Sequence, residues 1–359
     1  MNNNTMPNSR ENNLNIIRFI AAVMVIYGHM FPIMGQYSYT IFNQAVSTIG
    51  VEIFFVISGY LITKSFLSDK SPVCYAIKRI FRIIPGLLAL CLVSVFVLGP
   101  IVSDFTTQQY FGEYFEYAWD YMKNVIMFPI YSLPGVFTDN IYPGAVNGSL
   151  WTLPIEAAMY ILVPVIIAVF GRKKGYKVGL VAAAIAAVVL NYIKLKWYPS
   201  ARVVVWGTDL MAAMNLVPYF LVGALFTFDK IKKLLNLQVA SLLFFVTIML
   251  FTSYQNTQFL MVIVLPYFIF SLAFDTKPVF MKFGTKIDLS YGMYLYGFVI
   301  QQLLVKYIGK YNLSVNVMFV LSTVLSMGCA VISWYVVEKP AQKFGKFLTK
   351  KYREIRYKN

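Results

Sequence analysis

The stretch LNIIRFIAAVMVIYGHMFPI (residues 14–33) decides the fold class, because it is long and apolar enough to cross a membrane as one helix. About 20 predominantly apolar residues span the hydrocarbon core of a bilayer. Two ionisable side chains interrupt the stretch, Arg18 and His29, and His29 is the only histidine of the chain. Ionisable groups are costly in lipid and therefore indicate function. An imidazole exchanges a proton near neutral pH, so His29 is a candidate for proton transfer.

The composition of the whole chain supports a membrane location. Of the 359 residues, 59% are hydrophobic and 13% are charged, and the mean hydropathy is +0.65. Soluble domains are about half apolar and about a quarter charged. The net charge of +16 comes from Lys and Arg in short loops, as is typical of cytoplasmic loops, and this argues against nucleic acid as a partner. Three cysteines predict neither a disulfide framework nor a metal site.

Ten apolar segments predict an all-α, polytopic membrane bundle of about ten transmembrane helices. The expected spans are 14–33, 45–67, 80–102, 150–170, 176–193, 210–228, 237–252, 257–274, 289–309 and 315–337. Placing both termini in the cytoplasm puts most of the Lys and Arg side chains on the inner side. We therefore expect a cytoplasmic tail at 1–13, a membrane domain at 14–338 and a basic cytoplasmic tail at 339–359, in a multi-pass protein of the inner (cytoplasmic) membrane.

The longest connection, at about 103–149, is expected on the outer side and is rich in tyrosine and phenylalanine. Its segment YFGEYFEYAWDYMKNVIMF (110–128) predicts an amphipathic helix at the membrane interface. A second interpretation is that its aromatic rings form platforms for a sugar. A connection of this length is too long to be a simple link.

Three buried ionisable side chains, His29, Glu52 and Glu156, are expected in one layer of the bundle, with Arg18 nearer the cytoplasmic end. Eleven residues of helix turn through three turns and about 20°, so Arg18 and His29 share one face. Glu52 and Glu156 lie about two turns inside the second and fourth spans. Since charges in lipid pair with one another, one of the two carboxylates is expected to bind His29 and fix its tautomer.

Basic residues gather at the cytoplasmic start of the third span, where CYAIKRIFRIIP contains Lys78, Arg79 and Arg82. Guanidinium groups bind phosphates with two parallel hydrogen bonds, so a cofactor with several phosphates could dock here. The alternative is that these side chains only anchor the helix at the inner surface.

These residues resemble the acyltransferase-3 family of integral membrane proteins, which includes the O-acetyltransferases of bacterial surface polysaccharides. The resemblance runs from Asn13 to about Phe344. It rests on Arg18 and His29 with ten residues between them, GVEIFFVISGYLI (50–62), KRIFRIIP (78–85), SLWTLPIEAAMY (149–160), SYGMYLYGF (290–298) and VEKP (337–340). It implies transfer of an acyl group, commonly acetyl from acetyl-CoA, to a hydroxyl of a glycan or lipid-linked sugar. Many members have a histidine where this chain has Gly297.

By this resemblance His29 is the expected catalytic residue, Arg18 belongs to its motif, Arg79 and Arg82 are the basic pair, and Glu156 is the carboxylate of the fourth span. We expect His29 to act as a base, oriented by Glu156 or Glu52. The basic groups Arg18, Arg79, Arg82 and Lys78 are expected to hold the phosphates of CoA. A covalent acetyl-His29 intermediate remains the alternative.

The expected partners are an acyl-CoA, a sugar acceptor and membrane lipid, with a second copy of the chain left open. No metal is expected. A competing class is a proton-coupled transporter or a flippase for glycan lipids, since these also bury charges in a helical bundle. Such carriers commonly contain internally related halves, and this sequence contains no repeat.

Overall fold

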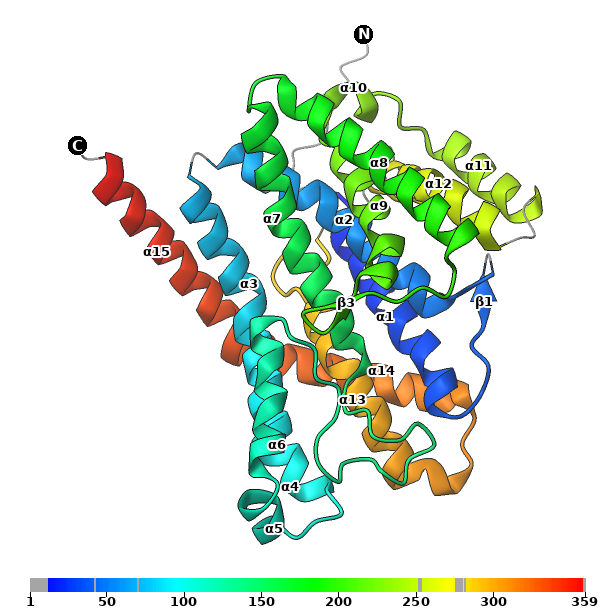
Figure 1. The fold of residues 1–359 in the computed structure, drawn as a ribbon, viewed down its shortest axis with the longest axis vertical. Helices are drawn as coiled ribbons and strands as arrows, with labels where there is room; N and C mark the ends of the chain where they lie inside the picture. Colours follow the sequence, from blue (N-terminus) through cyan, green and yellow to red (C-terminus); the bar gives the residue numbers. More distant parts are fainter. Residues whose placement is uncertain are drawn as a thin grey trace.

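The protein is described by a computed structural model that covers residues 12–41, 43–69, 71–250, 254–274, 280 and 282–357. The fold is a bundle of helices (Figure 1). The expected N-terminal tail, apart from Asn12 and Asn13, lies outside the described residues.

Each of the ten segments predicted as a span forms a helix. The long helices are α1 Leu14–Ile33, α2 Val46–Ser68, α3 Pro72–Val93, α7 Thr152–Phe170, α8 Gly175–Trp197, α9 Leu210–Leu225, α11 Leu237–Leu250, α12 Tyr254–Phe274, α13 Ser290–Ile308, α14 Val315–Ser333 and α15 Lys339–Tyr357. A π-helical turn, Ser94–Leu98, joins α3 to α4 (Gly99–Val102). Helices satisfy their own backbone hydrogen bonds, as lipid requires.

Seven helical stretches in the described part are long and apolar enough to cross a membrane. They are Leu14–Ile33, Val46–Ser68, Pro72–Val102, Gly148–Phe170, Gly175–Trp197, Asn256–Phe274 and Val315–Arg356. Two further apolar helices, Leu210–Leu225 and Leu237–Met249, are shorter. The chain is thus a multi-pass membrane protein, while the number of ten spans and the cytoplasmic placement of both termini stay predictions.

The remaining elements are short. They are the antiparallel pair β1 Thr40–Ile41 and β2 Gln44–Ala45, the pair β3 Val204–Val205 and β4 Thr208–Asp209, the helices α5 Thr107–Gly112, α6 Phe115–Trp119 and α10 Asp229–Lys232, and the 3-10 helices Asp120–Ile126, Gly148–Trp151 and Gly309–Tyr311. The single amphipathic helix expected over 110–128 is wrong: the chain forms α5, α6 and a 3-10 helix there. The first of these breaks falls just after Gly112, a residue that disfavours helix interiors.

The backbones of α2 and α9 approach each other closely at two glycines. A Cβ atom on Gly59 would lie 1.9 Å from the carbonyl oxygen of Phe220, and one on Gly223 would lie 2.2 Å from that of Val56. Small residues at such crossings are typical of helix packing in membranes, where close contact replaces the hydrophobic effect as the driving force. Gly59 therefore serves packing, next to Ser58, which faces the site described below.

The C-terminal helix α15 continues α14 through a second π-helical turn, Trp334–Glu338, and packs along α3 (Figure 1). The rings of Phe81 and Phe344 lie 5.7 Å apart at this contact. At its far end Arg353 forms an ion pair of 3.0 Å with Asp69, in the turn between α2 and α3. The basic tail expected at 339–359 is therefore a helix that is bound to the bundle over its described length.

Candidate active site

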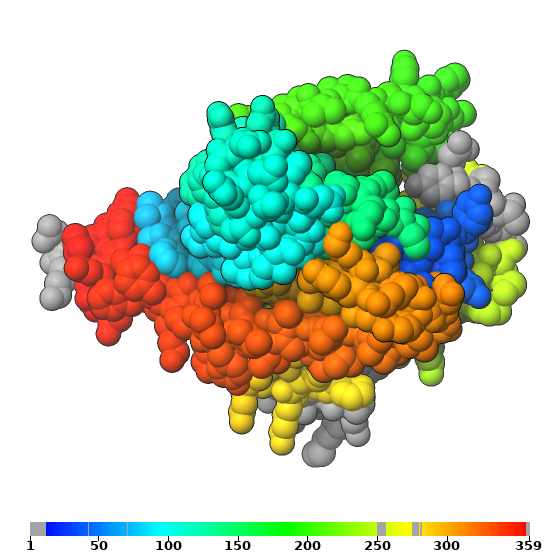
Figure 2. Space-filling view, turned by 90° about the horizontal axis from the view of Figure 1, so that it is seen from below, coloured from blue at the N-terminus to red at the C-terminus, as the bar shows by residue number. Residues whose placement is uncertain are grey.

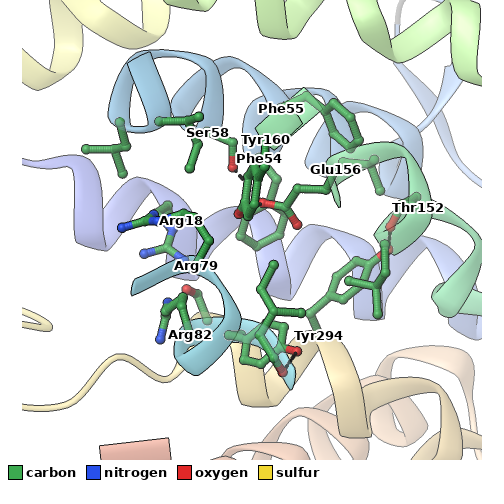
Figure 3. Close-up of a pocket in the computed structure, with 17 residues that line it drawn as sticks. Arg18, Phe54, Phe55, Ser58, Arg79, Arg82, Thr152, Glu156, Tyr160 and Tyr294 are labelled. Carbon is green, nitrogen blue, oxygen red and sulfur yellow. Dashed lines mark hydrogen bonds between the residues drawn. The ribbon is translucent and has the colours of Figure 1, made fainter. Parts of the chain in front are cut away.

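A cavity of about 100 Å³ lies where α1, α2, α3, α7 and α13 meet (Figure 3). Its walls are formed by Arg18, Val51, Phe54, Phe55, Ser58, Leu61, Ile62, Arg79, Arg82, Ile83, Thr152, Leu153, Glu156, Tyr160, Ser290, Tyr291 and Tyr294. Figure 3 shows the three arginines on one side, Thr152 and Tyr294 on the other, and Glu156 between them. The cavity therefore has a cationic end and a hydroxyl-bearing end.

Asp288 holds two of the arginines at the cationic end. Its Oδ2 accepts hydrogen bonds from Arg18 at 2.8 Å and from Arg82 at 2.5 Å. Arg82 also lies 3.7 Å from Glu338, which the second π-helical turn presents. Burial favours the neutral carboxyl of Asp288, but Arg18 and Arg82 outweigh it and hold its pKa well below the usual range. Asp288 is consequently ionised at neutral pH and fixes both guanidinium groups.

Arg79 differs from its two neighbours because it makes no ion pair within the described residues. Its guanidinium carbon lies 5.9 Å from the centre of the Tyr75 ring, and its Nε is buried without a hydrogen-bond partner. A buried N–H group without a hydrogen-bond partner is unfavourable in the free protein. Arg79 is therefore the group at this end that is most available to an anionic ligand.

Glu156 occupies the middle of the cavity and is held by two hydroxyl groups. Its Oε1 accepts hydrogen bonds from Ser58 Oγ at 2.9 Å and from Tyr160 Oη at 2.6 Å. Tyr160 lies one turn after Glu156 on α7, and Ser58 reaches it from α2. The carboxylate is thereby fixed in orientation between the two helices.

The hydroxyl-bearing end is formed by Thr152 and Tyr294. Tyr294 Oη donates to the carbonyl of Ser149 at 2.7 Å and lies 2.5 Å from Thr152 Oγ1. Both side chains are buried. These hydroxyl groups are the polar groups of the cavity that lie farthest from the arginines (Figure 3).

His29 does not line the cavity. Its ring packs edge-on against Phe298, with ring centres 5.6 Å apart. Phe298 follows Tyr294 by four residues on α13, so the two rings share one helix face about 6 Å apart along the axis. His29 therefore lies about one helical turn beyond the hydroxyl-bearing end.

The expected bond between His29 and a carboxylate is absent from the described structure. Glu156 binds Ser58 and Tyr160 instead. Glu52 is fully buried, lies toward Gln44 and Tyr219, and does not line the cavity. These groups were expected in one layer because they lie at similar depths in neighbouring helices. Depth alone does not determine which face of each helix points into the cavity.

Lys78 also departs from its expected place. Its ammonium group pairs with Asp69 at 2.5 Å and does not line the cavity. Burial opposes ionisation of Asp69, but Lys78 and Arg353 outweigh it and keep its pKa below the usual value. Of the four basic residues expected in one group, the structure brings Arg18, Arg79 and Arg82 together and assigns Lys78 to the contact with α15.

The sequence analysis missed Asp288, Tyr160, Thr152 and Tyr294. Asp288 had a usable signal, since it is an acidic residue in the basic segment KFGTKID (282–288), two positions before the motif SYGMYLYGF. The other three lie inside quoted motifs, but an aromatic or threonine in an apolar helix is most often a packing residue.

Comparison with known proteins identifies the family. Residues 11–335 match the family described as an acyltransferase domain, and the chain therefore belongs to this family of membrane acyltransferases. It is 28% identical over 343 residues to the O-acetyl transferase of Shigella phage Sf6, covering 92% of this chain and 96% of the relative. It is 25% identical over 370 residues to nodulation protein 10 of Rhizobium leguminosarum bv. viciae, covering 95% of both chains. No solved structure is significantly similar.

Proposed function

We propose that this acyltransferase takes an acetyl group from acetyl-CoA and transfers it to a hydroxyl of a cell-surface polysaccharide or lipid-linked sugar at the inner membrane. The proposal rests on the arrangement of groups along the cavity. Three arginines lie at one end, and His29 lies one helical turn beyond the opposite end. The name of the phage relative, an O-acetyl transferase, supports the choice of acetyl and of an oxygen acceptor.

The arginine end suits the phosphates of CoA. Arg18 and Arg82 line the cavity and are not fully buried, with 18% and 19% of their side chains accessible. Asp288 holds both in fixed positions, and Arg79 contributes a guanidinium without an ion-pair partner in the described structure. Planar guanidinium groups bind phosphate through paired, charge-assisted hydrogen bonds. The pantetheine arm then extends past Glu156 toward Thr152 and Tyr294.

The reaction needs a base and groups that stabilise an oxyanion. In direct transfer His29 accepts the proton of the acceptor hydroxyl while the hydroxyl oxygen bonds to the carbonyl carbon of the thioester. The carbon–sulfur bond then breaks, and the CoA sulfur leaves with the proton from His29. Hydrogen-bond donors aimed at the carbonyl oxygen lower the barrier. The hydroxyls of Tyr294 and Thr152 lie at the end of the cavity nearest His29. In this role Tyr294 would exchange its hydrogen bond to the Ser149 carbonyl for one to the carbonyl oxygen of the thioester.

In the covalent alternative His29 itself attacks the thioester and carries the acetyl group to the acceptor. Both routes require the acetyl carbon and His29 to meet. His29 packs on Phe298 and does not line the cavity, so either route needs a movement of side chains that brings the imidazole to the thioester. Protein labelled by radioactive acetyl-CoA in the absence of acceptor, and unlabelled as His29→Ala, would distinguish the covalent route.

The test of the proposal is transfer by the purified protein. Labelled acetyl-CoA is incubated with the protein in vesicles and with surface polysaccharide from which acetyl groups have been removed by mild alkali. Alkali-labile label on the polysaccharide is expected, and none is expected with His29→Ala, provided that this variant unfolds at the same temperature as the parent. Movement of a glycan lipid across the vesicle without any transfer would overturn the proposal in favour of a flippase.

A further inference from the structure

A second, more open cavity of about 560 Å³ lies in the connection between α4 and α7. Three aromatic rings, Phe105, Tyr114 and Tyr117, line it together with Asp120 and Ser132. The connection forms a raised mass beside α13 and α14, coloured cyan to green in Figure 2. Neither the arginine-lined cavity nor the transfer step described above uses these residues.

The aromatic wall is rigid. Phe105 and Tyr114 stack face to face, with ring centres 3.9 Å apart and an angle of 9° between the ring planes. Behind them Gly135 has a φ of +66°, and a Cβ atom there would lie 2.5 Å from Ser103 Oγ. Only glycine fits this conformation and this space without strain. The stacked rings are thus packed against each other and against the turn at Gly135.

The ring of Tyr117 is the aromatic face of the cavity that is open to a ligand. Its side chain is 68% exposed, and no ring contact involves it in the described structure. Asp120 lies near it, with one carboxylate oxygen bound to Lys123 at 2.8 Å. An exposed ring beside a carboxylate and the Ser132 hydroxyl offers a flat apolar face and hydrogen-bonding groups at its edge.

This combination fits a sugar ring. The C–H bonds on the face of a pyranose carry partial positive charge and stack on the electron-rich face of an aromatic ring, while the hydroxyls around its edge bind carboxylates and hydroxyls. A surface that only contacts lipid tails would not present a carboxylate, since a charge in lipid is costly.

A series of contacts leads from the lining of the cavity to His29. The carbonyl of Tyr131, beside the lining residue Ser132, accepts a hydrogen bond from Val146 N at 2.7 Å. Two residues further on, the Cβ position of Gly148 lies 2.9 Å from the ring of Phe298, and Phe298 packs on His29. A short series of contacting groups thus separates the aromatic cavity from the imidazole.

Polar contacts also fix the connection to α13. Gln302 accepts from Asn140 Nδ2 at 2.9 Å and donates to the carbonyl of Ala145 at 2.7 Å. Lys306 pairs with Asp139 at 2.8 Å. These contacts join the connection to α13, the helix that carries Phe298.

We infer that the cavity of Phe105, Tyr114, Tyr117 and Asp120 binds a sugar of the acceptor chain that is remote from the acetylated one. This inference rests on the proposed function and adds an acceptor subsite to it. It makes the protein prefer a polymeric acceptor over a single sugar, because a polymer occupies the subsite and the catalytic position together.

The experiment compares acceptor fragments of different length. Deacetylated surface polysaccharide is cut into monosaccharides and longer fragments, and the initial rate of transfer from acetyl-CoA is measured for each. Tyr117→Ala is expected to raise the KM for long fragments about tenfold, the effect of losing one aromatic contact. The kcat, the KM for acetyl-CoA and the rate with monosaccharide are expected to stay unchanged.

Two variants serve as controls. Tyr37→Ala removes a tyrosine that is 100% exposed and lies outside the cavity, and it is expected to leave every constant unchanged. Tyr117→Trp keeps an aromatic face and should retain the low KM.

The outcomes are distinct. No transfer to any fragment by the parent protein contradicts the proposed function itself. Transfer with the same KM in Tyr117→Ala and Tyr37→Ala overturns the acceptor subsite alone. An unchanged KM combined with weaker retention of Tyr117→Ala in vesicles also overturns it and assigns Tyr117 to the membrane interface.

Discussion

Replacing Arg79 by glutamine tests the donor site directly, because Arg79 and its neighbour Lys78 have opposite surroundings. Arg79 lines the cavity and has no ion-pair partner within the described residues, whereas Lys78 is bound to Asp69 away from the cavity. Removing Arg79 should therefore affect the donor and not the fold. Removing Lys78 should lower stability and leave the binding of the donor unchanged.

The expected magnitude follows from one charge-assisted hydrogen bond to a phosphate, about 1.5 to 3 kcal/mol. Arg79→Gln should raise the KM for acetyl-CoA roughly 10- to 150-fold, since 1.4 kcal/mol corresponds to a factor of about ten. Lys78→Gln should leave this KM unchanged. It should cost at most about 1 kcal/mol of stability, because the ion pair is partly exposed and Asp69 retains Arg353.

The assay measures the release of free thiol from acetyl-CoA and, in parallel, from acetyl-pantetheine, which lacks the phosphates. Arg79→Gln should discriminate against acetyl-CoA only and use acetyl-pantetheine as well as the parent does. Equal losses with both donors would show that Arg79 supports the fold and not the phosphates, and this result would refute the assignment of the arginine end. Thermal unfolding in detergent provides the check on stability.

Four further changes have defined outcomes. His29→Ala should abolish transfer at an unchanged unfolding temperature, and residual transfer above background would exclude His29 as base or nucleophile. Tyr294→Phe should lower kcat about 100-fold with little change in the KM for acetyl-CoA, as expected for loss of one oxyanion donor; an unchanged kcat would remove Tyr294 from the reaction. Gly59→Ala should destabilise by several kcal/mol, because the new Cβ would meet backbone at 1.9 Å, whereas Gly328→Ala, with open space around it, should be neutral or stabilising in thermal unfolding. Because the pKa of Asp69 is lowered in the fold, its stabilising contribution is complete at neutral pH and is lost only as the pH falls through and below the ordinary aspartate range; Asp69→Asn should therefore lower the unfolding temperature at pH 7 and show a weaker acid dependence than the parent.

The sequence predicted the helices well because lipid allows few alternatives. A segment of about 20 apolar residues must satisfy its own backbone bonds, and this leaves a helix as the available form. The connection at 110–128 was predicted wrongly because no such constraint acts there. One amphipathic helix was expected, but the chain there makes contacts within the loop, such as the stack of Phe105 on Tyr114.

The site was predicted in part, for a related reason. Arg18, Arg79 and Arg82 were expected in one group and Glu156 as a carboxylate inside the bundle, because buried charges have to meet one another or water. That the arginines and Glu156 line one cavity was not expected. Their partners could not be assigned, since helices α2, α7 and α13 are apolar around most of their circumference and the sequence does not indicate which face of each is turned inward. Ser58 and Tyr160 bind Glu156, which had been expected to bind His29. Asp288 binds Arg18 and Arg82, for which only phosphates had been expected as partners.

The π-helical turn at Trp334–Glu338 has a consequence for the whole C-terminal helix. Such a turn contains one residue more than the α-helix would use, and each residue rotates the chain by about 100°. Deleting a single residue there would swing every side chain of α15 by that angle about the helix axis. Arg353 would then face away from Asp69, and Glu338 away from Arg82. This one extra residue therefore determines how α15 is rotated about its axis relative to the cavity.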